Sequence, residues 1–443
     1  MLRFGTDGVR GVANTELTPE LVLALGRALG RVLAPTTVVV GRDTRRSGPL
    51  IEAALAAGLA AEGADVLALG VAPTPAVAWV AADRGVPAAV VSASHNPFPD
   101  NGVKAFGPDG RKLDDAAEAR VEAEMRRLAA DAAAAPPTRQ AVEVGTLAGA
   151  ADLVGSWAAA VAGSIGGRDL DGLSVVVDCA NGAASAHAGP VLGSLGARVE
   201  VINASPDGTN INVDCGSTHP EGLAAAVLAS GADLGLAFDG DADRCLAVDG
   251  TGRVVDGDQL IAALALDRQA RGELRGGAVV VTVMANLGLR RALAERGIRV
   301  VETPVGDRHV LAALDAQDLV LGGEQSGHVI FRDLAVTGDG LLTGVQVLDL
   351  VRRAGAPLAE VVDAAMTRLP QVLRNVRVRG DGPSAVAGLA DDLAAAEAEL
   401  GDRGRILVRP SGTEPVVRVM VEADSESLAA ALADRLAGRL DPA

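Results

Sequence analysis

The sequence has no tyrosine, five phenylalanines, two tryptophans and only two lysines among 443 residues. Lysine and arginine together number 40, so the positive charge comes almost entirely from arginine. This bias makes the rare residues informative, because a position that keeps a disfavoured residue is expected to need its chemistry. The two lysines, Lys104 and Lys112, therefore call for separate explanations.

Cysteine and long apolar runs are also scarce. The three cysteines, Cys179, Cys215 and Cys245, lie far apart without a CxxC spacing, which excludes a disulfide framework and a zinc site of that type. The longest uncharged stretch, residues 66–82, is interrupted by two prolines and is too short to span a membrane. The first residues carry charge and glycine where a signal peptide has its apolar run. We therefore expect a cytoplasmic protein without a membrane partner.

The chain lacks an excess of positive charge, since its formal net charge is −17. Nucleic-acid binding requires a basic face and is therefore not expected. An anionic small-molecule substrate would need local cationic side chains or a metal ion.

A triple-valine strand occurs three times, at residues 38–40, 175–177 and 279–281. Each is followed by an Ala/Leu-rich helical stretch and then by a second strand that begins after Gly63, Gly196 or Gly297. Strand, helix and β-branched strand in this order predict βαβ crossovers, and hence α/β domains with mixed, largely parallel sheets. The repeats begin roughly 100–140 residues apart, which is the spacing of domains. They indicate three related domains, although any α/β protein contains such units.

The remainder of the chain predicts a different, smaller domain. Beyond Leu369-Pro370, strands are expected near residues 375–378, 405–408 and 416–421, with a helix from Ser425. This pattern is typical of a compact α+β domain. We predict four domains: 1–150, 151–252, 253–368 and 369–443.

The phenylalanines fall inside or beside four polar, glycine-rich segments, at residues 4–10, 92–106, 238–244 and 322–331. We expect each phenylalanine to anchor the base of its loop. Anchored loops are held in fixed shapes, as a functional site requires.

The segment from Asp239 to Asp243 places three aspartates within five residues, directly after the apolar strand 234–238. Their charges repel one another unless a cation or a proton intervenes. Oxygen ligands at this density suit Mg²⁺ or Ca²⁺. An EF-hand is excluded, because Arg244 and Gly250 occupy the positions that need glycine and glutamate. A solvated acidic turn is the alternative.

The segment Ser92–Pro97 follows the apolar run 88–91, so it lies where open α/β sheets place their ligands. Serine, asparagine and proline also make ordinary turns, and both interpretations stay open. In the segment 322–328, Glu324 and Ser326 can bind sugar hydroxyls, and His328 can titrate near neutral pH. A buried core histidine is the alternative for His328.

The segment Arg409–Pro415, with Arg418 beyond it, combines glycine, two hydroxyl groups and two guanidinium groups. These are the components of a phosphate-binding loop, although a structural Gly-Pro turn is the alternative. Lys104 can be tuned toward proton transfer, which arginine cannot. No function is expected for Lys112, which lies outside these segments.

Five segments in order resemble the motifs of the α-D-phosphohexomutases: Phe4–Gly11, Ser92–Pro97, Asp239–Arg244, Gly323–His328 and Arg409–Pro415. Gly323–His328 and Thr337–Leu342 are most similar to members that act on glucosamine phosphates. The resemblance implies three related α/β domains and a smaller C-terminal domain around a central cleft, in agreement with the repeats.

The resemblance also implies residue roles. Ser94 would be the phosphoserine, and Asp239, Asp241 and Asp243 would hold Mg²⁺ together with a phosphoryl oxygen of Ser94. Glu324 and Ser326 would bind sugar hydroxyls, with Arg308 as a further substrate contact. The non-reacting phosphate would be bound by Arg409, Ser411, Gly412, Thr413 and Arg418. The reacting centre would be lined by Arg10, Lys104, Arg244 and His328.

The sequence departs from the family pattern at Pro304 and His309, where lysine and tyrosine are usual, and at Pro99. His309 is therefore not assigned a catalytic role.

The resemblance implies an isomerase that moves a phosphoryl group within a hexose phosphate through a sugar 1,6-bisphosphate, which is both intermediate and activator. The protein would be a monomer or homodimer. Phosphomannomutase or phosphoglucomutase activity is the nearest alternative. A catalytically silent phosphosugar-binding protein and a simple phosphatase are the others.

Overall fold

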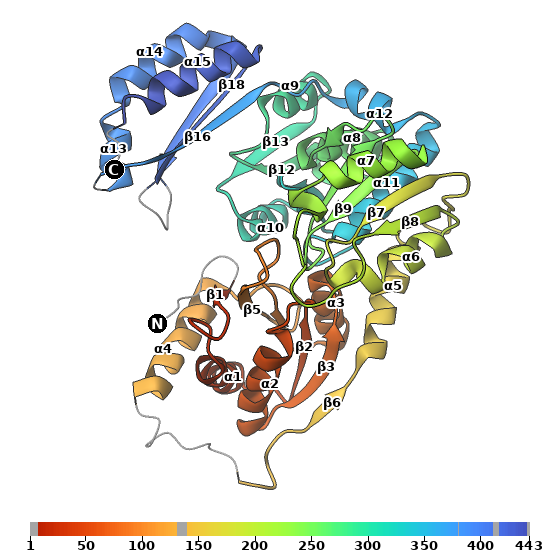
Figure 1. The fold of residues 1–443 in the computed structure, drawn as a ribbon, viewed down its shortest axis with the longest axis vertical. Helices are drawn as coiled ribbons and strands as arrows, with labels where there is room; N and C mark the ends of the chain where they lie inside the picture. Colours follow the sequence, from red (N-terminus) through yellow and green to blue (C-terminus); the bar gives the residue numbers. More distant parts are fainter. Residues whose placement is uncertain (1–7, 131–139, 380, 411–415, 441–443) are drawn as a thin grey trace.

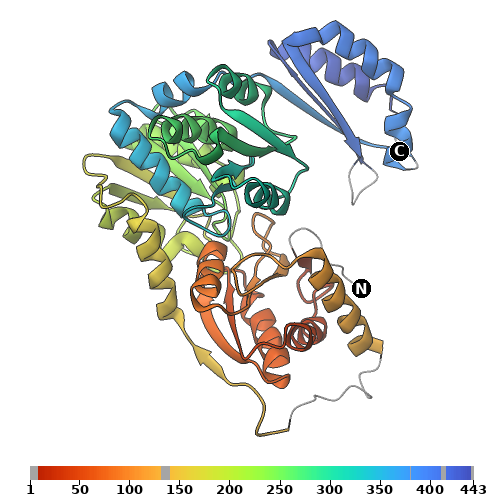
Figure 2. The same ribbon diagram turned by 180° about the vertical axis from the view of Figure 1, so that it is seen from behind.

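The computed structural model describes residues 8–130, 140–379, 381–410 and 416–440. Four β-sheets follow one another along the chain, three with six, five and four strands and a last one with three. In Figures 1 and 2 the first three sheets and their helices lie together, and the last sheet, which begins with strand β16 (Gln371–Arg377), stands apart. We call the parts of the chain around these sheets the first, second, third and C-terminal units.

The first unit has a six-stranded sheet in the order β1-β5-β4-β2-β3-β6. Its strands are β1 (Val9–Val12), β2 (Thr37–Arg42), β3 (Asp65–Val71), β4 (Ala88–Val91), β5 (Asp100–Phe106) and β6 (Leu147–Gly149). Its helices are α1 (Pro19–Leu33), α2 (Gly48–Ala61), α3 (Thr74–Arg84) and α4 (Asp115–Ala130). Strands β4, β2, β3 and β6 are parallel, whereas β5 runs antiparallel to β4 and β1.

The triple valine of β2 explains how this sheet is covered. Val38 and Val40 belong to the buried cluster of α1, α2 and α4, whereas Val39 belongs to the cluster that contains α3. Side chains alternate between the two faces of a strand, so an unbroken apolar run indicates burial on both faces.

The second sheet has the order β11-β10-β9-β7-β8 and the third has the order β13-β12-β14-β15. The strands of the second are β7 (Ser174–Asp178), β8 (Arg198–Ile202), β9 (Leu234–Phe238), β10 (Cys245–Asp249) and β11 (Val254–Val255). Those of the third are β12 (Ala278–Thr282), β13 (Arg299–Thr303), β14 (Leu321–Gly323) and β15 (Val329–Phe331). Their helices are α5 (Val154–Gly163), α6 (Ala188–Ser194), α7 (Glu221–Ser230), α8 (Gly257–Ala270), α9 (Leu287–Glu295), α10 (Asp307–Ala316), α11 (Gly340–Ala354) and α12 (Leu358–Ala365).

The three predicted βαβ units are confirmed. In each, the triple-valine strand pairs in parallel with the Gly-led strand that follows it: β2 with β3, β7 with β8 and β12 with β13. The fold class is therefore α/β with mixed, largely parallel sheets, as predicted.

The C-terminal unit is an antiparallel sheet of β16, β18 (Val416–Ala423) and β17 (Gly404–Pro410), in that order. Its helices are α13 (Gly382–Ala387), α14 (Ala390–Leu400) and α15 (Glu426–Ala437). It has a buried apolar cluster of its own. The predicted α+β character is confirmed.

The first three units are joined by one apolar core, because a single buried cluster runs from Val39 through Trp157 to Met366. The indole Nε1 of Trp157 also donates a hydrogen bond of 2.7 Å to Asp339 across this core. The predicted limits between these units therefore stay predictions.

Phe106, Phe238 and Phe331 are buried at loop bases, as expected. The expectation is wrong for Phe98, which is 38% exposed, and Phe4 lies outside the described residues. In the described part of the chain, no helix combines the length and the apolar character needed to cross a bilayer.

Candidate active site

The loop that contains Ser94 begins where β4 ends, as predicted. Ser94 is 2% exposed, and its backbone has the left-handed φ of 52°. Few non-glycine residues adopt this conformation, and such strain is concentrated at functional positions. The Ser94 hydroxyl donates a hydrogen bond of 2.6 Å to Oδ2 of Asp239, which lies in the second unit.

The shape of this loop is set by Arg45, which sequence analysis did not identify. Its fully buried guanidinium donates to the carbonyl oxygens of Ser94, Asn96, Pro97 and Asp100, at 2.5–2.9 Å. A planar group with five donors in fixed directions can bind several carbonyls of one loop at once. The signal in the sequence was a charged segment directly after the triple valine of β2.

Asp43 completes this support. Its carboxylate accepts from Arg45 Nε at 2.8 Å and from the Ser92 hydroxyl at 2.7 Å. Ser92 Oγ in turn accepts from the backbone N–H of Ser94. Burial raises the pKa of Asp43, while the Arg45 charge opposes that rise. The loop is therefore held by a buried ion pair.

The three predicted metal ligands lie together. Asp239, Asp241 and Asp243 are buried and each offers a carboxylate oxygen within 4.8 Å of the others. Oδ1 of Asp241 and Oδ1 of Asp243 are buried, and neither has a hydrogen-bond partner in the described part of the chain. A buried carboxylate oxygen without a donor is costly, whereas a hard divalent cation would use it as a ligand. The residues therefore fit a metal ion.

The electrostatics of the triad support the same conclusion. Burial, together with the charges of Asp243 and Asp241, raises the pKa of Asp239 well above its usual range. Burial alone would also raise the pKa of Asp241, but Lys104 lowers it below the ordinary value. A divalent cation would favour the ionised form of all three carboxylates.

Lys104 is buried on β5 and its ammonium group donates to Asp241 Oδ2 at 2.7 Å and to Asp243 Oδ2 at 3.4 Å. Thr74, at the start of α3, donates its hydroxyl to the same Asp241 oxygen at 2.6 Å. The first unit therefore supplies both the serine and a cation to the aspartate loop of the second. Lys104 lies next to the ligands of the candidate metal site.

A cavity of about 150 Å³ faces Ser94. It is lined by Arg10, Ser94, Asp243, Arg244, Val305, Gly306, Asp307, Glu324 and His328. These residues come from the first three units, so the cavity gathers predicted site residues that are far apart in the sequence. Burial and the charges of Arg244 and Arg10 lower the pKa of His95, beside Ser94, to about 4, so this imidazole is neutral at pH 7.

The predicted sugar-binding loop lies between β14 and β15. Glu324 accepts a hydrogen bond of 3.0 Å from the backbone N–H of Gly306. The Ser326 hydroxyl and both ring nitrogens of His328 are buried and have no hydrogen-bond partner in the described part of the chain. Buried polar groups usually have partners, so these atoms are available to a polar ligand.

Arg308 does not line this cavity. Its guanidinium forms ion pairs with Asp115 and Glu118 of α4. These ion pairs join the first and third units, and the substrate contact of Arg308 stays a prediction.

The predicted phosphate-binding arginines lie in the C-terminal unit. Arg409 on β17 and Arg418 on β18 are directly opposite each other in the antiparallel register. Burial and the neighbouring Arg418 charge lower the pKa of Arg409. Two cations in this position repel each other and would be stabilised by an anion between them. Ser411, Gly412 and Thr413 lie outside the described residues.

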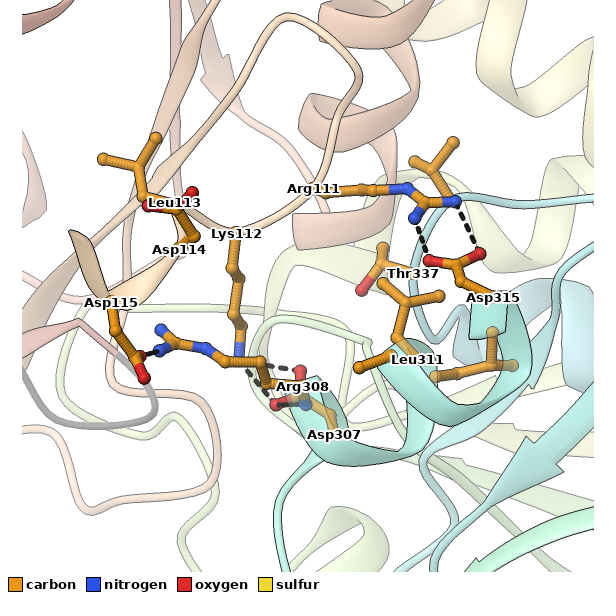
Figure 3. A pocket seen from close by; sticks show the side chains of 13 residues that line it. Arg111, Lys112, Leu113, Asp114, Asp115, Asp307, Arg308, Leu311, Asp315 and Thr337 are labelled. Atoms are coloured by element: carbon orange, nitrogen blue, oxygen red, sulfur yellow. Dashed lines mark hydrogen bonds and ion pairs between the residues drawn. The ribbon is translucent and has the colours of Figure 1, made fainter. Parts of the chain in front are cut away.

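A larger cavity, of about 360 Å³, lies between the first and third units, around Arg111, Lys112, Arg308 and Asp315 (Figure 3). It contains neither Ser94 nor a residue of the aspartate triad. We therefore place the candidate active site in the smaller cavity, where the reactive groups are.

Comparison with known families gives four consecutive matches. They are to the phosphoglucomutase/phosphomannomutase alpha/beta/alpha domains I, II and III, at residues 1–131, 160–252 and 256–369, and to the C-terminal domain, at residues 373–439. Together they cover most of the chain.

Individual relatives agree with these matches. The chain is 54% identical to phosphoglucosamine mutase of Moorella thermoacetica over 96% of each chain. It is 52% identical to phosphoglucosamine mutase of Mycobacterium ulcerans over 99% of each chain.

Among solved structures, a phosphoglucomutase/phosphomannomutase family protein of Burkholderia thailandensis has a TM-score of 0.81 at 28% identity, over 98% of this chain and 96% of that one. N-acetylphosphoglucosamine mutase of Aspergillus fumigatus, in complex with GlcNAc-6P and magnesium, has the same fold, with a TM-score of 0.69 at 20% identity over 99% and 95% of the two chains. The chain belongs to the phosphoglucosamine mutase family, within the α-D-phosphohexomutase superfamily.

Proposed function

We propose that this protein interconverts glucosamine 6-phosphate and glucosamine 1-phosphate by phosphoryl transfer through Ser94. The observation that carries the proposal is the hydrogen bond of 2.6 Å from the Ser94 hydroxyl to Asp239. It joins a strained, buried serine to a triad of carboxylates at the edge of a cavity that also holds two arginines. A serine in this setting is suited to carry a phosphoryl group that a cation and guanidinium groups neutralise.

The reaction would proceed in two transfers. In the first, the bond between phosphorus and Ser94 Oγ breaks, a bond to the C1 hydroxyl oxygen of glucosamine 6-phosphate forms, and that hydroxyl loses its proton. The product is the 1,6-bisphosphate. After the sugar has reversed its orientation, the phosphoryl group at C6 returns to Ser94, and the C6 oxygen gains a proton.

Asp239, Asp241 and Asp243 would hold Mg²⁺, the ion found with the related Aspergillus fumigatus enzyme. When bound, Mg²⁺ would neutralise charge on the phosphoryl group as transfer begins. Arg244 and Arg10 line the cavity and would bind the phosphoryl oxygens. Lys104 and His328 are the candidates for holding or moving the proton of the attacking hydroxyl.

Glu324 and Ser326 lie on the loop after β14 and would bind sugar hydroxyls. Arg409 and Arg418, with the segment 411–413, would bind the phosphate that does not react. That phosphate is at C6 in one transfer and at C1 in the other, so one phosphate site would serve both orientations. Arg308 stays a further proposed substrate contact, although its ion pairs with Asp115 and Glu118 lie outside the cavity.

The choice of glucosamine over glucose or mannose rests on the phosphoglucosamine mutases that are 52–54% identical to this chain. The alternative is phosphoglucomutase or phosphomannomutase activity on the same fold. We further propose a cytoplasmic enzyme that is activated by the 1,6-bisphosphate and acts as a monomer or homodimer.

Side-by-side kinetics on glucosamine, glucose and mannose 6-phosphates test the proposal. With Mg²⁺ and a hexose 1,6-bisphosphate present, kcat/KM should be highest for glucosamine 6-phosphate. Ser94→Ala should lose activity by orders of magnitude while its circular dichroism and Tm stay close to wild type. Full activity of Ser94→Ala, or release of inorganic phosphate in place of the 1-phosphate, would contradict the proposal.

A further inference from the structure

Asp307, the first residue of α10, lies between two cavities. It lines the cavity that contains Ser94 and also the larger cavity between the first and third units. Its carboxylate therefore faces a space that, on the proposed function, receives phosphoryl groups. Two negative groups at close range disfavour each other, most strongly where water is excluded.

Lys112 lies on the other side of this carboxylate. Its ammonium nitrogen is 2.7 Å from Oδ2 and 2.9 Å from Oδ1 of Asp307, and both side chains are mostly buried, at 12% and 14% exposed. Figure 3 shows Lys112 reaching from the first unit across to Asp307 in the third. The sequence predicts no function for Lys112, yet in the structure this second lysine pairs with a residue that lines the reaction cavity.

Asp307 also approaches His328, with 3.8 Å between Oδ2 and Nε2. The backbone N–H of Arg308 donates to Asp307 Oδ1 at 2.8 Å. The position of the Asp307 carboxylate is thus fixed from two directions, by Lys112 and by the start of α10. A change at Lys112 would reach the reaction cavity through Asp307.

Among the described residues, other ion pairs also join the first and third units. Arg111 pairs with Asp315, and Arg308 pairs with Asp115 and Glu118. Arg111 and Asp315 line the larger cavity, but neither lines the one that contains Ser94. None of the residues in these pairs lines the cavity that contains Ser94, whereas Asp307, the partner of Lys112, does.

We propose that Lys112 is a positioning residue for phosphoryl transfer: it neutralises the Asp307 carboxylate, which lies beside His328, so that the cavity accepts a phosphorylated sugar. This inference rests on the proposed function. It assigns to Lys112 a role that depends on the charge of Asp307 and therefore disappears when that charge is removed.

The dependence on Asp307 permits a double-mutant test. Lys112→Met should lower kcat/KM by about 10-fold or more, since it removes the ammonium group that pairs with the Asp307 carboxylate near the phosphoryl groups. Most of the loss should be in KM, because the repulsion acts on the bound phosphosugar as well as on the transition state. Asp307→Asn added to Lys112→Met should restore kcat/KM to within about threefold of wild type.

Two matched variants separate charge from geometry. Lys112→Arg keeps the positive charge and should retain most of the activity. Arg111→Met removes the neighbouring ion pair between the same units, and its kcat/KM should stay within about threefold of wild type. Tm of every variant shows whether a loss of activity reflects unfolding.

The outcomes are distinct. An active wild-type enzyme with a normal Lys112→Met variant would overturn the inference, as would a folded Lys112→Met variant that Asp307→Asn does not rescue. An equal loss in Arg111→Met would also overturn it, because the loss would then follow from weakening any contact between the first and third units. Absence of mutase activity in the wild type would refute the proposed function itself.

Discussion

At the scale of single residues, the two lysines of an arginine-rich chain both contact carboxylates at the candidate active site. Lys104 binds Asp241 and Asp243, and Lys112 binds Asp307. The rarity of lysine, together with the place of Lys104 in a glycine-rich segment, predicted a function for Lys104. It did not point to Lys112, whose partner is 195 residues away in sequence.

Lys104→Arg tests whether Lys104 does more than balance charge. If the ammonium exchanges or orients the proton of the attacking hydroxyl, a planar guanidinium will not replace it. We expect kcat to fall by about 10²-fold or more, the usual scale for general acid–base groups. Steady-state kinetics and Tm provide the measurement. The matched control is Arg84→Lys, a cation exchange on the exposed end of α3. A normal kcat for Lys104→Arg would make His328 the better candidate for proton transfer.

Asp241→Asn tests the metal site. EDTA should abolish turnover of the wild type, and Mg²⁺ should restore it. In the variant, loss of one charged ligand should raise the Mg²⁺ concentration needed for half-maximal activity by at least about 10-fold. Isothermal titration calorimetry with Mg²⁺ measures the same change without turnover. Asp169→Asn, at an exposed aspartate, is the control. An unchanged Mg²⁺ requirement in Asp241→Asn would indicate that the triad is only an acidic turn.

At the scale of elements, three functional loops follow strands whose residues are buried. Strands β4 and β9 end at the serine loop and at the aspartate loop, and β14 ends at the sugar-binding loop. The left-handed φ of Ser94 needs support from outside its own loop, and the segment after β2 supplies it through Arg45. The sequence predicted the position of the loop that contains Ser94, but it did not predict the hydrogen bonds from Arg45 that support this loop.

Arg45→Lys tests this support. A lysine keeps the charge beside Asp43 but cannot bind four carbonyls in a plane, so the serine should lose its fixed position. Displacement of a reacting group by about 1 Å can cost about 10²-fold in rate, and we expect a loss in kcat of about 10-fold or more with a smaller change in KM. Arg46→Lys, at the exposed neighbour, is the control for folding and for kinetics. Equal kcat values in the two variants would argue that Arg45 supports only the stability of the fold.

At the scale of the whole molecule, the first three units share one core and together form the reaction cavity, while the C-terminal unit has its own core. No described residue of the C-terminal unit lines that cavity. Arg405 and Glu422 join this unit to the third: Arg405 donates to the carbonyl oxygens of Val283 and Ala285, and Glu422 accepts from the N–H of Leu287. Because the C-terminal unit has a core of its own, it is suited to move toward the reaction cavity when a phosphosugar binds.

The junction of the third and C-terminal units contains Asp258, a buried carboxyl near Glu422. Burial, reinforced by the charge of Asp256, raises the pKa of Asp258 to about 8. Its pKa in the unfolded chain is near the ordinary value of 3.8. Between these two values the folded protein keeps a proton that the unfolded chain releases, so the free energy of unfolding should fall as pH rises from about 4 to about 8.

Asp258→Asn should remove this contribution and leave Tm less dependent on pH. The variant should gain stability relative to wild type at pH 8 and gain little at pH 5. Thermal unfolding followed by circular dichroism from pH 5 to pH 9 measures the difference. Parallel Tm curves for the two proteins would show that Asp258 does not titrate in this range.

The local elements and the identity of the reactive groups could be predicted from the amino-acid sequence. Buried valine runs and the polar segments after them depend on side-chain burial and turn chemistry, which are local properties. Which groups meet depends on the tertiary structure: Ser94 lies against Asp239, Arg45 binds four carbonyls, Lys112 pairs with Asp307, and Arg308 pairs with residues of α4. These contacts join positions that are distant in the chain, and their geometry depends on how whole sheets pack, which no local pattern encodes.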